Sequence, residues 1–362
     1  MTSRKVLFVY NRVRSERAAA FAAGLAPDDS LYGLHAIRER GFDAEFDDIG
    51  HDIRGIGRLY KAADDALSGG GRRIGFHWWQ AKRLLPRLRS ADLVFATADS
   101  SALPILWLRR RGLFRAPVVY GSIGLTQSFS DVRGALFRWY RELAGSAARV
   151  VAFSMRERDE LVTRFGMDGG RAVFVPFGVD ASFYRPGGTG DAPPLAFGLD
   201  PMRDWPTLAA ATREFTGPID VIAIPDRLDG TAIPPSWRVS PPVDFAALAA
   251  RIAAAKFVIL PVRENPYTGA TISLLSAMAC GKAVIVSRTS ALAEGYGLTP
   301  GDNVVFVEPG DAEGLRASIH RLSTDPALCA RIGAAARAHV EHAYTVDHMA
   351  DRFAAIFREA LA

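Results

Sequence analysis

Short apolar runs alternate along the first half of the chain with segments whose apolar residues recur at helical spacing. The runs are typical of buried strands and the segments are typical of helices. Because strands that are separated by helices usually pair in parallel, this order predicts a parallel sheet with helices on its faces. The predicted strands of the first half are 5–10, 91–97, 116–122, 148–154 and 172–177.

The alternation stops at the Pro- and Gly-rich stretch 185–194, which is typical of a linker, and then begins again. The sequence therefore predicts an α/β protein with two Rossmann-like, doubly wound domains. Ligands of such sheets bind beyond the carboxyl ends of the strands, so a cleft that both domains face is the predicted site. The predicted strands of the second half are 195–199, 219–225, 257–262, 283–287 and 304–309.

The charge of the chain is unevenly divided. The 362 residues carry a formal net charge of +5, which is the balance of +9 in residues 1–185 and −4 in residues 186–362. A basic first half indicates an anionic partner such as phosphate, acidic lipid or nucleic acid, and the alternative is a solvated arginine-rich surface. No nucleic-acid recognition module is visible, so no nucleic-acid partner is expected.

The segment 76–90 combines Trp78 and Trp79 with several basic residues. Aromatic residues beside basic ones suit contact with a membrane surface or an anionic acceptor, and the alternative is a basic surface over a buried tryptophan pair. The amino terminus lacks the pattern of a signal peptide, and no apolar run is long enough to span a membrane. We therefore expect a cytoplasmic protein with peripheral contact at the inner membrane face through 76–90. The two cysteines, Cys280 and Cys329, agree with a reducing compartment.

The stretch from Pro261 to Gly281 passes from a strand end through small and polar residues into an apolar helix. Gly269, Ala270 and Thr271 lie where that helix begins. The first turn of a helix has unpaired N–H groups and partial positive charge, and small residues let an anion approach the backbone closely. The stretch therefore predicts an anion site, with ordinary helix capping as the alternative.

Four stretches resemble the retaining GT-B glycosyltransferases of family 4. LLSAMACGKAVIVSRTSALAEG (274–295), followed by GDNVVFVEPGD (301–311), resembles the helix, turn and strand of their carboxyl half. VPFGVDASFYRP (175–186) resembles the entry to their second domain, and FGLDPMRDWPTLAAA (197–211) resembles its first turn. The resemblance implies the GT-B fold and a nucleotide-diphosphate sugar that lies against the second domain.

The resemblance also predicts that the chain is divided into two domains and a final helix. Residues 1–185 are expected to form an acceptor-side domain and residues 186–345 a nucleotide-sugar-binding domain. The final helix, 346–362, is expected to return to the first domain with an apolar face that includes Phe353 and Ile356.

The site residues follow from the same resemblance. Family members usually carry two glutamates at the positions that Thr268 and Ser276 occupy here, and both residues are expected to contact the donor. Glu264 is the nearby carboxylate that we expect to hold a sugar hydroxyl, unless it only caps the loop. Arg203 matches a basic residue of the family and is expected to contact the diphosphate, with a surface ion pair to Asp204 or Asp200 as the alternative. Residues 269–271 would offer backbone N–H groups to sugar and phosphate.

Asp99 lies just beyond the predicted strand 91–97. There its carboxylate can accept a hydrogen bond from an acceptor or sugar hydroxyl, or it can cap the following helix. No metal-ligand spacing and no Asp-x-Asp after a strand is visible, so neither a metal nor a cofactor is expected besides the nucleotide-sugar substrate.

The predicted function is metal-independent transfer of a sugar, with retention, from a nucleotide-diphosphate sugar to a small-molecule, glycan or lipid-linked acceptor. A non-catalytic sugar-nucleotide-binding homologue or partner subunit is the alternative, because the glutamate pair is missing. A nicotinamide-dependent oxidoreductase would need a glycine-rich turn after the first strand, and VYNRVRSERAAAF has no glycine. The arginine- and alanine-rich composition is typical of a bacterial protein.

Overall fold

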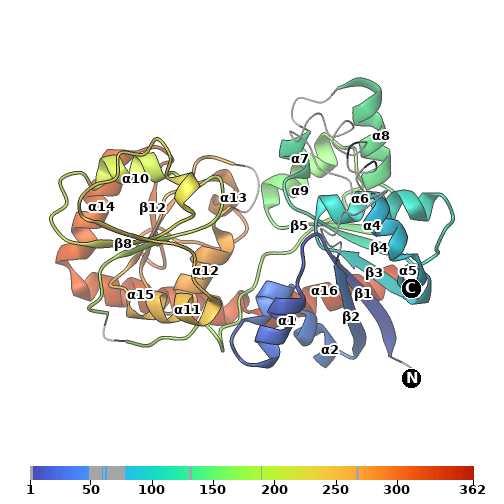
Figure 1. Ribbon diagram of the computed structural model, residues 1–362, viewed down its shortest axis with the longest axis horizontal. Coiled ribbons are helices and arrows are strands. Elements are labelled where there is room, and N and C mark those ends of the chain that lie inside the picture. The colour runs from blue at the N-terminus through green and yellow to red at the C-terminus, as the bar shows by residue number, and fades with distance from the viewer. Residues whose placement is uncertain are drawn as a thin grey trace. The chain divides into compact units, whose positions relative to one another are not determined.

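The computed structural model divides into two compact units, shown in Figure 1. Unit 1 consists of Met1–Ala20, Ser30–Pro176 and Met349–Ala362, and unit 2 of Phe21–Asp29 and Phe177–His348. The structure describes residues 3–48, 59, 62, 78–129, 133–188, 190–265 and 269–362, with residues 78–80 described by their backbone alone.

Unit 1 is built on a six-stranded sheet in the order β2-β1-β3-β4-β5-β6. All five neighbouring pairs run parallel. The chain order reverses beside β1, because β2 lies on one side of it and β3 on the other. The strands are β1 (Arg4–Tyr10), β2 (Phe42–Asp48), β3 (Leu93–Ala96), β4 (Val118–Ser122), β5 (Arg149–Ala152) and β6 (Ala172–Phe174).

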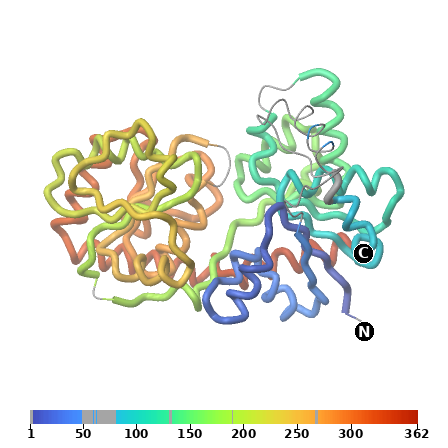
Figure 2. The backbone as a smooth tube through the Cα atoms, viewed as in Figure 1, coloured from blue at the N-terminus to red at the C-terminus, as the bar shows by residue number. Residues whose placement is uncertain are grey.

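Helices cover both faces of this sheet (Figure 1). On one face Leu7 and Val9 of β1 belong to a core with α6 and α8. On the other face Phe8 contacts Phe357 of α16, with ring centroids 6.2 Å apart, and Figure 2 shows this C-terminal helix beside the N-terminal strands. The helices are α1 (Ser15–Ala22), α2 (Leu34–Glu39), α4 (Trp78–Arg83), α5 (Leu85–Ser90), α6 (Asp99–Arg110), α7 (Leu125–Ser128), α8 (Gly134–Ala144), α9 (Met155–Thr163) and α16 (Val346–Leu361), with a 3₁₀ turn at Asp28–Leu31.

Unit 2 repeats this arrangement with a six-stranded parallel sheet in the order β12-β11-β10-β7-β8-β9. Here the reversal lies between β7 and β10. Its strands are β7 (Leu195–Phe197), β8 (Ile219–Ile222), β9 (Trp237–Ser240), β10 (Val258–Leu260), β11 (Val284–Ser287) and β12 (Val305–Val307). Its helices are α10 (Trp205–Ala211), α11 (Phe245–Ala254), α12 (Thr271–Ala279), α13 (Ser290–Ala293), α14 (Ala312–Thr324) and α15 (Pro326–Ala343), with a 3₁₀ turn at Pro225–Arg227.

The prediction of two doubly wound α/β domains is confirmed by these sheets. The sequence pattern did not reveal β2, because four of its seven residues are acidic. Two cations explain why this strand is stable: Lys5 pairs with Glu45 at 3.0 Å, and Arg87 pairs with Glu45 at 2.8 Å and with Asp47 at 2.6 Å. Strand β9 was also missed, since Arg238 and Val239 are exposed in it.

No helix among the described residues is long and apolar enough to cross a membrane. Of the segment 76–90, residues 76 and 77 and the side chains of 78–80 lie outside the described part of the chain. Two of its basic residues have structural partners: Arg87 holds β2, and Arg89 donates to the carbonyl of Leu113 at 2.9 Å.

Candidate functional site

Two loops of unit 2 meet where its strand order reverses. The loop after β7 contains Gly198 and Arg203, and the loop after β10 contains Val262 and leads to the start of α12. Arg203 and Val262 form an isolated antiparallel bridge that joins the two loops. Open parallel sheets bind ligands at this kind of position. We call this region, with Ser273 and Ser276 of α12, the unit 2 edge.

Arg203 is the buried cation of the unit 2 edge, with an exposed fraction of 3%. Its guanidinium donates to Ser273 Oγ in the first turn of α12, at 2.8 Å. The side chain packs against Gly198, where a Cβ atom would lie 1.9 Å from Nε of Arg203. The neighbouring Asp204 makes its side-chain hydrogen bonds elsewhere: its carboxylate accepts from Thr207 N and Oγ1 and caps α10. Arg203 therefore brings positive charge to the start of α12.

The start of α12 supplies further polar groups at the same edge. Ala270 precedes the helix with φ of 68°, a left-handed conformation that few residues with a side chain adopt. Thr271 is fully buried, and its Oγ1 has no hydrogen-bond partner among the described residues. The same holds for Oδ1 of the buried Asn265, whose amide nitrogen donates to the carbonyl of Arg263 at 2.7 Å. A buried polar atom without a partner costs about 1–3 kcal/mol, which a ligand that pairs with it would recover.

Gly269 lies beside two polar side chains. A Cβ atom there would lie 3.2 Å from Asn265 Oδ1 and 3.4 Å from Asp200 Oδ2. The other carboxylate oxygen of Asp200 accepts from Met202 N at 2.6 Å. Asp200 thus brings a carboxylate to the unit 2 edge, although the sequence analysis considered it only as an ion-pair partner for Arg203. Thr268 lies outside the described residues.

Glu264 is turned away from this cluster. It is exposed, and its carboxylate accepts from the backbone N of Ser290 at 3.2 Å and from the Ser290 hydroxyl. These bonds place Glu264 at the start of α13. The structure therefore brings Arg203, Gly269, Ala270 and Thr271 together at the unit 2 edge. Glu264 does not join them, because its carboxylate is bound to Ser290.

An apolar pocket of about 240 Å³ adjoins the unit 2 edge. Ser276 lines it and donates its hydroxyl proton to the carbonyl of Ile272 at 2.7 Å, within its own helix. Burial raises the pKa of Tyr184, another wall residue, well above its ordinary value. The lining residues are Tyr184, Phe197, Gly198, Leu199, Ile222, Pro242, Val243, Phe245, Leu248, Ile272, Ser273 and Ser276.

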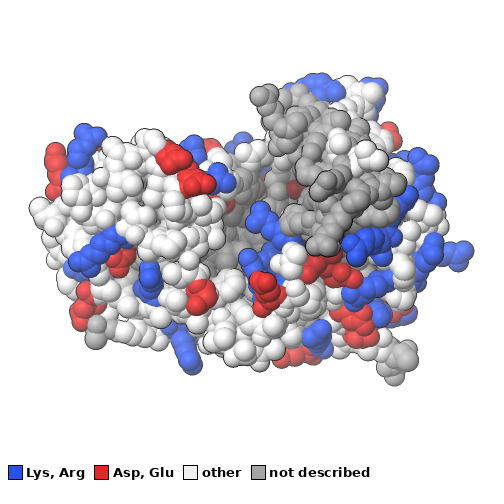
Figure 3. Space-filling view, in the orientation of Figure 1, with Lys and Arg blue, Asp and Glu red and all other residues white. Residues whose placement is uncertain are grey.

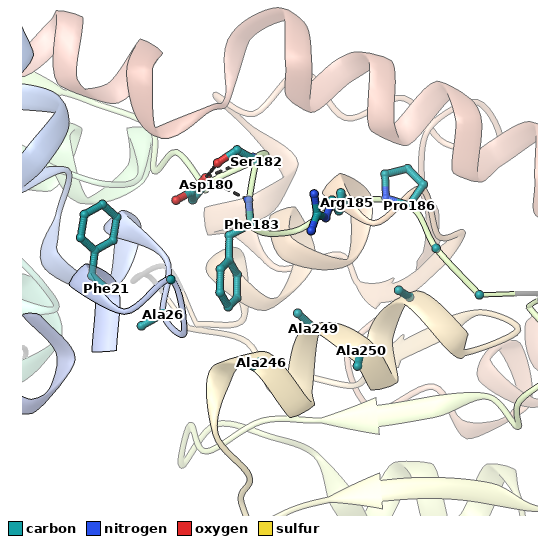
Figure 4. A pocket seen from close by; sticks show the side chains of 14 residues that line it. Phe21, Ala26, Asp180, Ser182, Phe183, Arg185, Pro186, Ala246, Ala249 and Ala250 are labelled. Carbon is teal, nitrogen blue, oxygen red and sulfur yellow. Dashed lines mark hydrogen bonds between the residues drawn. The ribbon is translucent and has the colours of Figure 1, made fainter. Parts of the chain in front are cut away.

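Unit 2 has a larger pocket, of about 720 Å³, beside the alanine-rich side of α11 (Figure 4). Phe21 and Phe183 line it, and Arg185 is the basic side chain at its wall. Asp180 accepts from the hydroxyl of Ser182 at 2.6 Å and from Asp28 N at 3.3 Å, so both of its carboxylate oxygens have partners within unit 2. Arg185 is exposed, whereas Arg203 is buried, and we therefore place the candidate site at the unit 2 edge.

In unit 1, Asp99 begins α6 at the carboxyl end of β3 and is 5% exposed. The N-cap residue is Ala98, which makes no side-chain cap bond. The Asp99 carboxylate accepts from the hydroxyl of Tyr120 and from Ile123 N, the latter at 3.4 Å. Burial raises the pKa of Asp99 to about 6, while the hydrogen bond from Tyr120 lowers it.

Glu157 is a second buried carboxylate near this edge, and the sequence analysis missed it. It accepts from the hydroxyl of Ser122 at 2.7 Å, from Gly124 N at 2.9 Å and from Leu125 N at 3.1 Å. Burial raises its pKa to about 8. The available signal was Ser154 three residues earlier, a capping pattern in which Ser154 Oγ accepts from Glu157 N at 3.0 Å. The glutamate side chain extends to the loop after β4.

The exposed charge is mixed on the face drawn in Figure 3, where Lys and Arg lie among Asp and Glu over both units. Within the described residues, no three His, Cys, Asp or Glu side chains come together as ligands for a metal ion.

Two family models match separate stretches of the chain. The family model "Glycosyltransferase Family 4" matches residues 49–183, and the model "Glycosyl transferase-like" matches residues 207–355. Among solved structures, sucrose-phosphate synthase from Thermosynechococcus elongatus has a TM-score of 0.71 at 16% identity, covering 98% of each chain. HepE of Anabaena, solved in complex with UDP and glucose, has a TM-score of 0.70 at 14% identity, covering 97% of this chain and 98% of its own.

The fold of the chain is therefore GT-B. The two matching family models both describe glycosyltransferases, and each covers less than half of the chain. Among curated proteins it is 26% identical to a D-inositol 3-phosphate glycosyltransferase of Streptomyces bingchenggensis, over 61% of this chain and 54% of that protein. A protein of the same name from Rhodococcus opacus is 25% identical, over 61% and 55%. The chain thus spans about half the length of these relatives.

Proposed function

We propose that the chain transfers a sugar from a nucleoside diphosphate sugar to a hydroxyl group of an acceptor, with retention of the anomeric configuration and without a divalent metal. The observation that carries this proposal is the meeting of two sources of positive charge at the unit 2 edge. The buried guanidinium of Arg203 lies 2.8 Å from Ser273 Oγ, in the first turn of α12. Retention and metal independence are what the family 4 resemblance implies.

The chemistry of the donor explains why these groups suit it. When the bond between the sugar and the diphosphate breaks, negative charge develops on the leaving phosphate oxygen. A fixed guanidinium and oriented first-turn N–H groups stabilise such charge without reorganisation, as preorganised donors do in other enzymes. In this proposal Arg203 and residues 271–273 supply the neutralisation that a divalent metal supplies in other sugar transferases.

The unit 2 edge also has groups that suit the nucleoside and the sugar of the donor. The apolar pocket of about 240 Å³ adjoins Ser273 and suits a nucleoside. The carboxylate of Asp200 beside Gly269 suits the hydroxyls of the sugar, the role that the sequence predicted for Glu264. Solved complexes of HepE, which shares the fold, contain UDP-glucose, so UDP-sugars are the first donors to test.

The acceptor is proposed to bind at unit 1, with its reacting hydroxyl donating to Asp99. This side chain is the buried carboxylate that lines a pocket at the carboxyl ends of β1, β3 and β4. The relatives named D-inositol 3-phosphate glycosyltransferases support a small polyol as acceptor over a glycan or a lipid-linked one.

The test is an assay of purified chain with UDP-, GDP- and ADP-sugars and small polyol acceptors. We expect release of the nucleoside diphosphate with one donor class, an unchanged rate in the presence of a chelator, and a product whose NMR coupling constant shows retained configuration. Binding of a sugar nucleotide without any turnover would contradict the proposal and favour a non-catalytic homologue. A rate that collapses with chelator would contradict the metal-independent part alone.

A further inference from the structure

Unit 1 has a pocket of about 430 Å³ at the reversal point of its sheet. The pocket lies beyond the carboxyl ends of β1, β3 and β4, and β1 and β3 are the strands between which the chain order reverses. Its lining residues are Asn11, Arg12, Arg14, Arg17, Tyr32, Ala98, Asp99, Ser100, Ile123 and Ser128. We call it the arginine pocket.

Three arginines from one short segment, Arg12, Arg14 and Arg17, line this pocket. Among the described residues, no carboxylate oxygen lies within ion-pair distance of the guanidinium of Arg12 or Arg14. The Arg14 Nε atom is buried and has no hydrogen-bond partner in the described part of the chain. Asp48 accepts from the backbone N of Arg14 at 3.0 Å, so it fixes the main chain of this segment.

Positive charge that is concentrated in this way attracts an anion. Two or three guanidinium groups around a small space match the geometry of a phosphate, which accepts paired N–H bonds from each fork. Burial of part of Arg14 strengthens this attraction, since the local dielectric constant is lower than in water.

The backbone of Tyr32, on the same wall, is held in a conformation that tyrosine rarely adopts. Its φ angle is 57°, in the left-handed region that costs a residue with a side chain roughly 1–3 kcal/mol. The neighbouring carbonyl of Leu31 is fixed by the hydroxyl of the buried Tyr10, at 2.7 Å. Such strain persists where the surrounding structure imposes it, and it occurs mainly at ligand sites.

The opposite wall carries Asp99, whose carboxylate is held by Tyr120 and Ile123 N. A ligand that fills the arginine pocket therefore meets cations on one side and a hydrogen-bond acceptor on the other. A phosphate alone satisfies only the cations. A polyol or sugar that carries a phosphate also has hydroxyl groups that can donate to Asp99.

We infer that the arginine pocket binds the anionic group of the acceptor, and that the acceptor is a phosphorylated polyol or sugar whose reacting hydroxyl hydrogen-bonds to Asp99. This inference rests on the proposed function, because it assigns the acceptor of that transfer. The same arginines have the chemistry to bind the diphosphate of the donor. The experiment therefore distinguishes an acceptor phosphate from a donor diphosphate.

The first arm of the experiment measures binding of inorganic phosphate to the full chain by the shift of its thermal unfolding. The double variant Arg12→Ala/Arg14→Ala is compared with wild type and with Arg115→Ala, which removes an exposed arginine before β4. We expect the double variant to weaken phosphate binding about 10- to 100-fold, the size of one or two lost charge-assisted bonds, and Arg115→Ala to leave it as in wild type. Equal phosphate binding by all three proteins would show that phosphate binds elsewhere as an adventitious ion only, and it would overturn the inference.

The second arm compares matched acceptors with and without phosphate, such as inositol and inositol 3-phosphate, or glucose and glucose 6-phosphate. We expect wild type to prefer the phosphorylated member in kcat/KM, and the double variant to lose about 10- to 100-fold of that preference. A rise in the donor KM of the double variant, with the acceptor preference retained, would assign the arginines to the donor diphosphate and overturn the inference.

Donor hydrolysis without an acceptor separates this inference from the proposed function. If wild type releases nucleoside diphosphate but shows no preference for phosphorylated acceptors, the proposed function stands and the arginine pocket is wrongly assigned. If no donor is hydrolysed or used, yet the double variant loses phosphate binding, the anion site stands and the transferase proposal fails.

Discussion

The two sheets of this chain share one design, but their carboxyl edges bury opposite charges. Unit 2 buries the guanidinium of Arg203 beside the start of α12. Unit 1 buries the carboxylates of Asp99 and Glu157, held by hydroxyl and backbone donors. A doubly wound sheet places its loops in the same way in both units, so the residues in those loops decide which ligand each edge suits. An edge with a buried cation suits a leaving diphosphate, and an edge with a buried carboxylate suits a hydroxyl.

The largest effect should come from removal of the buried cation. Arg203→Ala is expected to lower kcat/KM for the donor by roughly 2–4 kcal/mol of transition-state stabilisation, the size seen when one preorganised donor is lost. Arg337→Ala is the matched control, because Arg337 is another arginine of unit 2 and its guanidinium bonds the carbonyls of Ala181 and Tyr184. It should lower stability and leave the activity of the folded fraction close to wild type. Equal activity losses in both variants would mean that Arg203 only supports the fold.

The two acidic residues near the unit 2 edge should behave differently. Asp200→Asn is expected to lower donor turnover about 10- to 100-fold, because a carboxylate that holds sugar hydroxyls makes charge-assisted hydrogen bonds. Glu264→Gln is expected to cost about 0.5–1 kcal/mol of stability, with little effect on turnover, because its carboxylate bonds Ser290. Steady-state kinetics and urea unfolding of the two variants measure this. The reverse order of activity losses would return the sugar-binding role to Glu264.

The buried carboxylates of unit 1 should make the stability of the chain depend on pH. Burial raises the pKa of Glu157 from 4.5 to about 8, so between these values the folded chain keeps a proton that the unfolded chain releases. The free energy of unfolding should therefore fall as pH rises through this window, by up to about 1.4 kcal/mol per pH unit for this group. The values of about 6 for Asp99 and about 7 for Asp29 act in the same direction.

Glu157→Gln removes this titration and keeps an oxygen that can accept the bonds of Gly124 and Leu125. Urea unfolding at pH 5.5, 6.5 and 7.5 should give a flatter dependence for this variant than for wild type. Glu142→Gln, at an exposed position of α8, should keep the wild-type slope. Parallel slopes for all three proteins would show that Glu157 does not hold a proton in the folded state.

The smallest effect is expected at Thr271. Thr271→Val keeps the shape of the side chain and removes the buried Oγ1 that has no partner among the described residues. Stability should stay equal or rise, because an unpaired polar atom is removed, while donor affinity should fall about tenfold if the ligand pairs with this hydroxyl. Calorimetry with UDP and thermal unfolding measure the two quantities. A loss of stability without a loss of affinity would make the hydroxyl structural.

The sequence predicted the parts of this molecule in which local pattern and burial agree. Strands such as β1 and β10 are continuous apolar runs because helices cover both faces of their sheets. The start of α12 and its end near Gly281, with φ of 70°, were also predicted, because small residues and glycine mark helix ends. Strand β2 was missed because its charges are balanced by Lys5 and by Arg87, which is distant in the sequence.

The candidate site shows the same limit. Arg203 was found through a motif, and the structure buries it beside the start of α12. Asp200 was missed as a site residue because nothing in its own stretch of sequence distinguishes it. For Glu157 the local signal, the cap at Ser154, does not show where its side chain extends. Asp200 matters through a loop that returns some 70 residues later, at Gly269, and Glu157 through the loop after β4. The carboxylate of Glu264 is bound by Ser290, and nothing in the sequence indicates that these two residues, 26 positions apart, are in contact.

The central claim is that the diphosphate of the donor binds at the unit 2 edge, and hydrogen exchange of the full chain with and without UDP tests it most directly. The first-turn amides of α12 have no helical partner of their own, since the first helical bond runs from Leu274 N to the carbonyl of Ala270. We predict that UDP slows exchange at residues 271–273 and in the loop 198–204. Slowed exchange at residues 11–17 and 98–101 with no change in unit 2 would contradict the account.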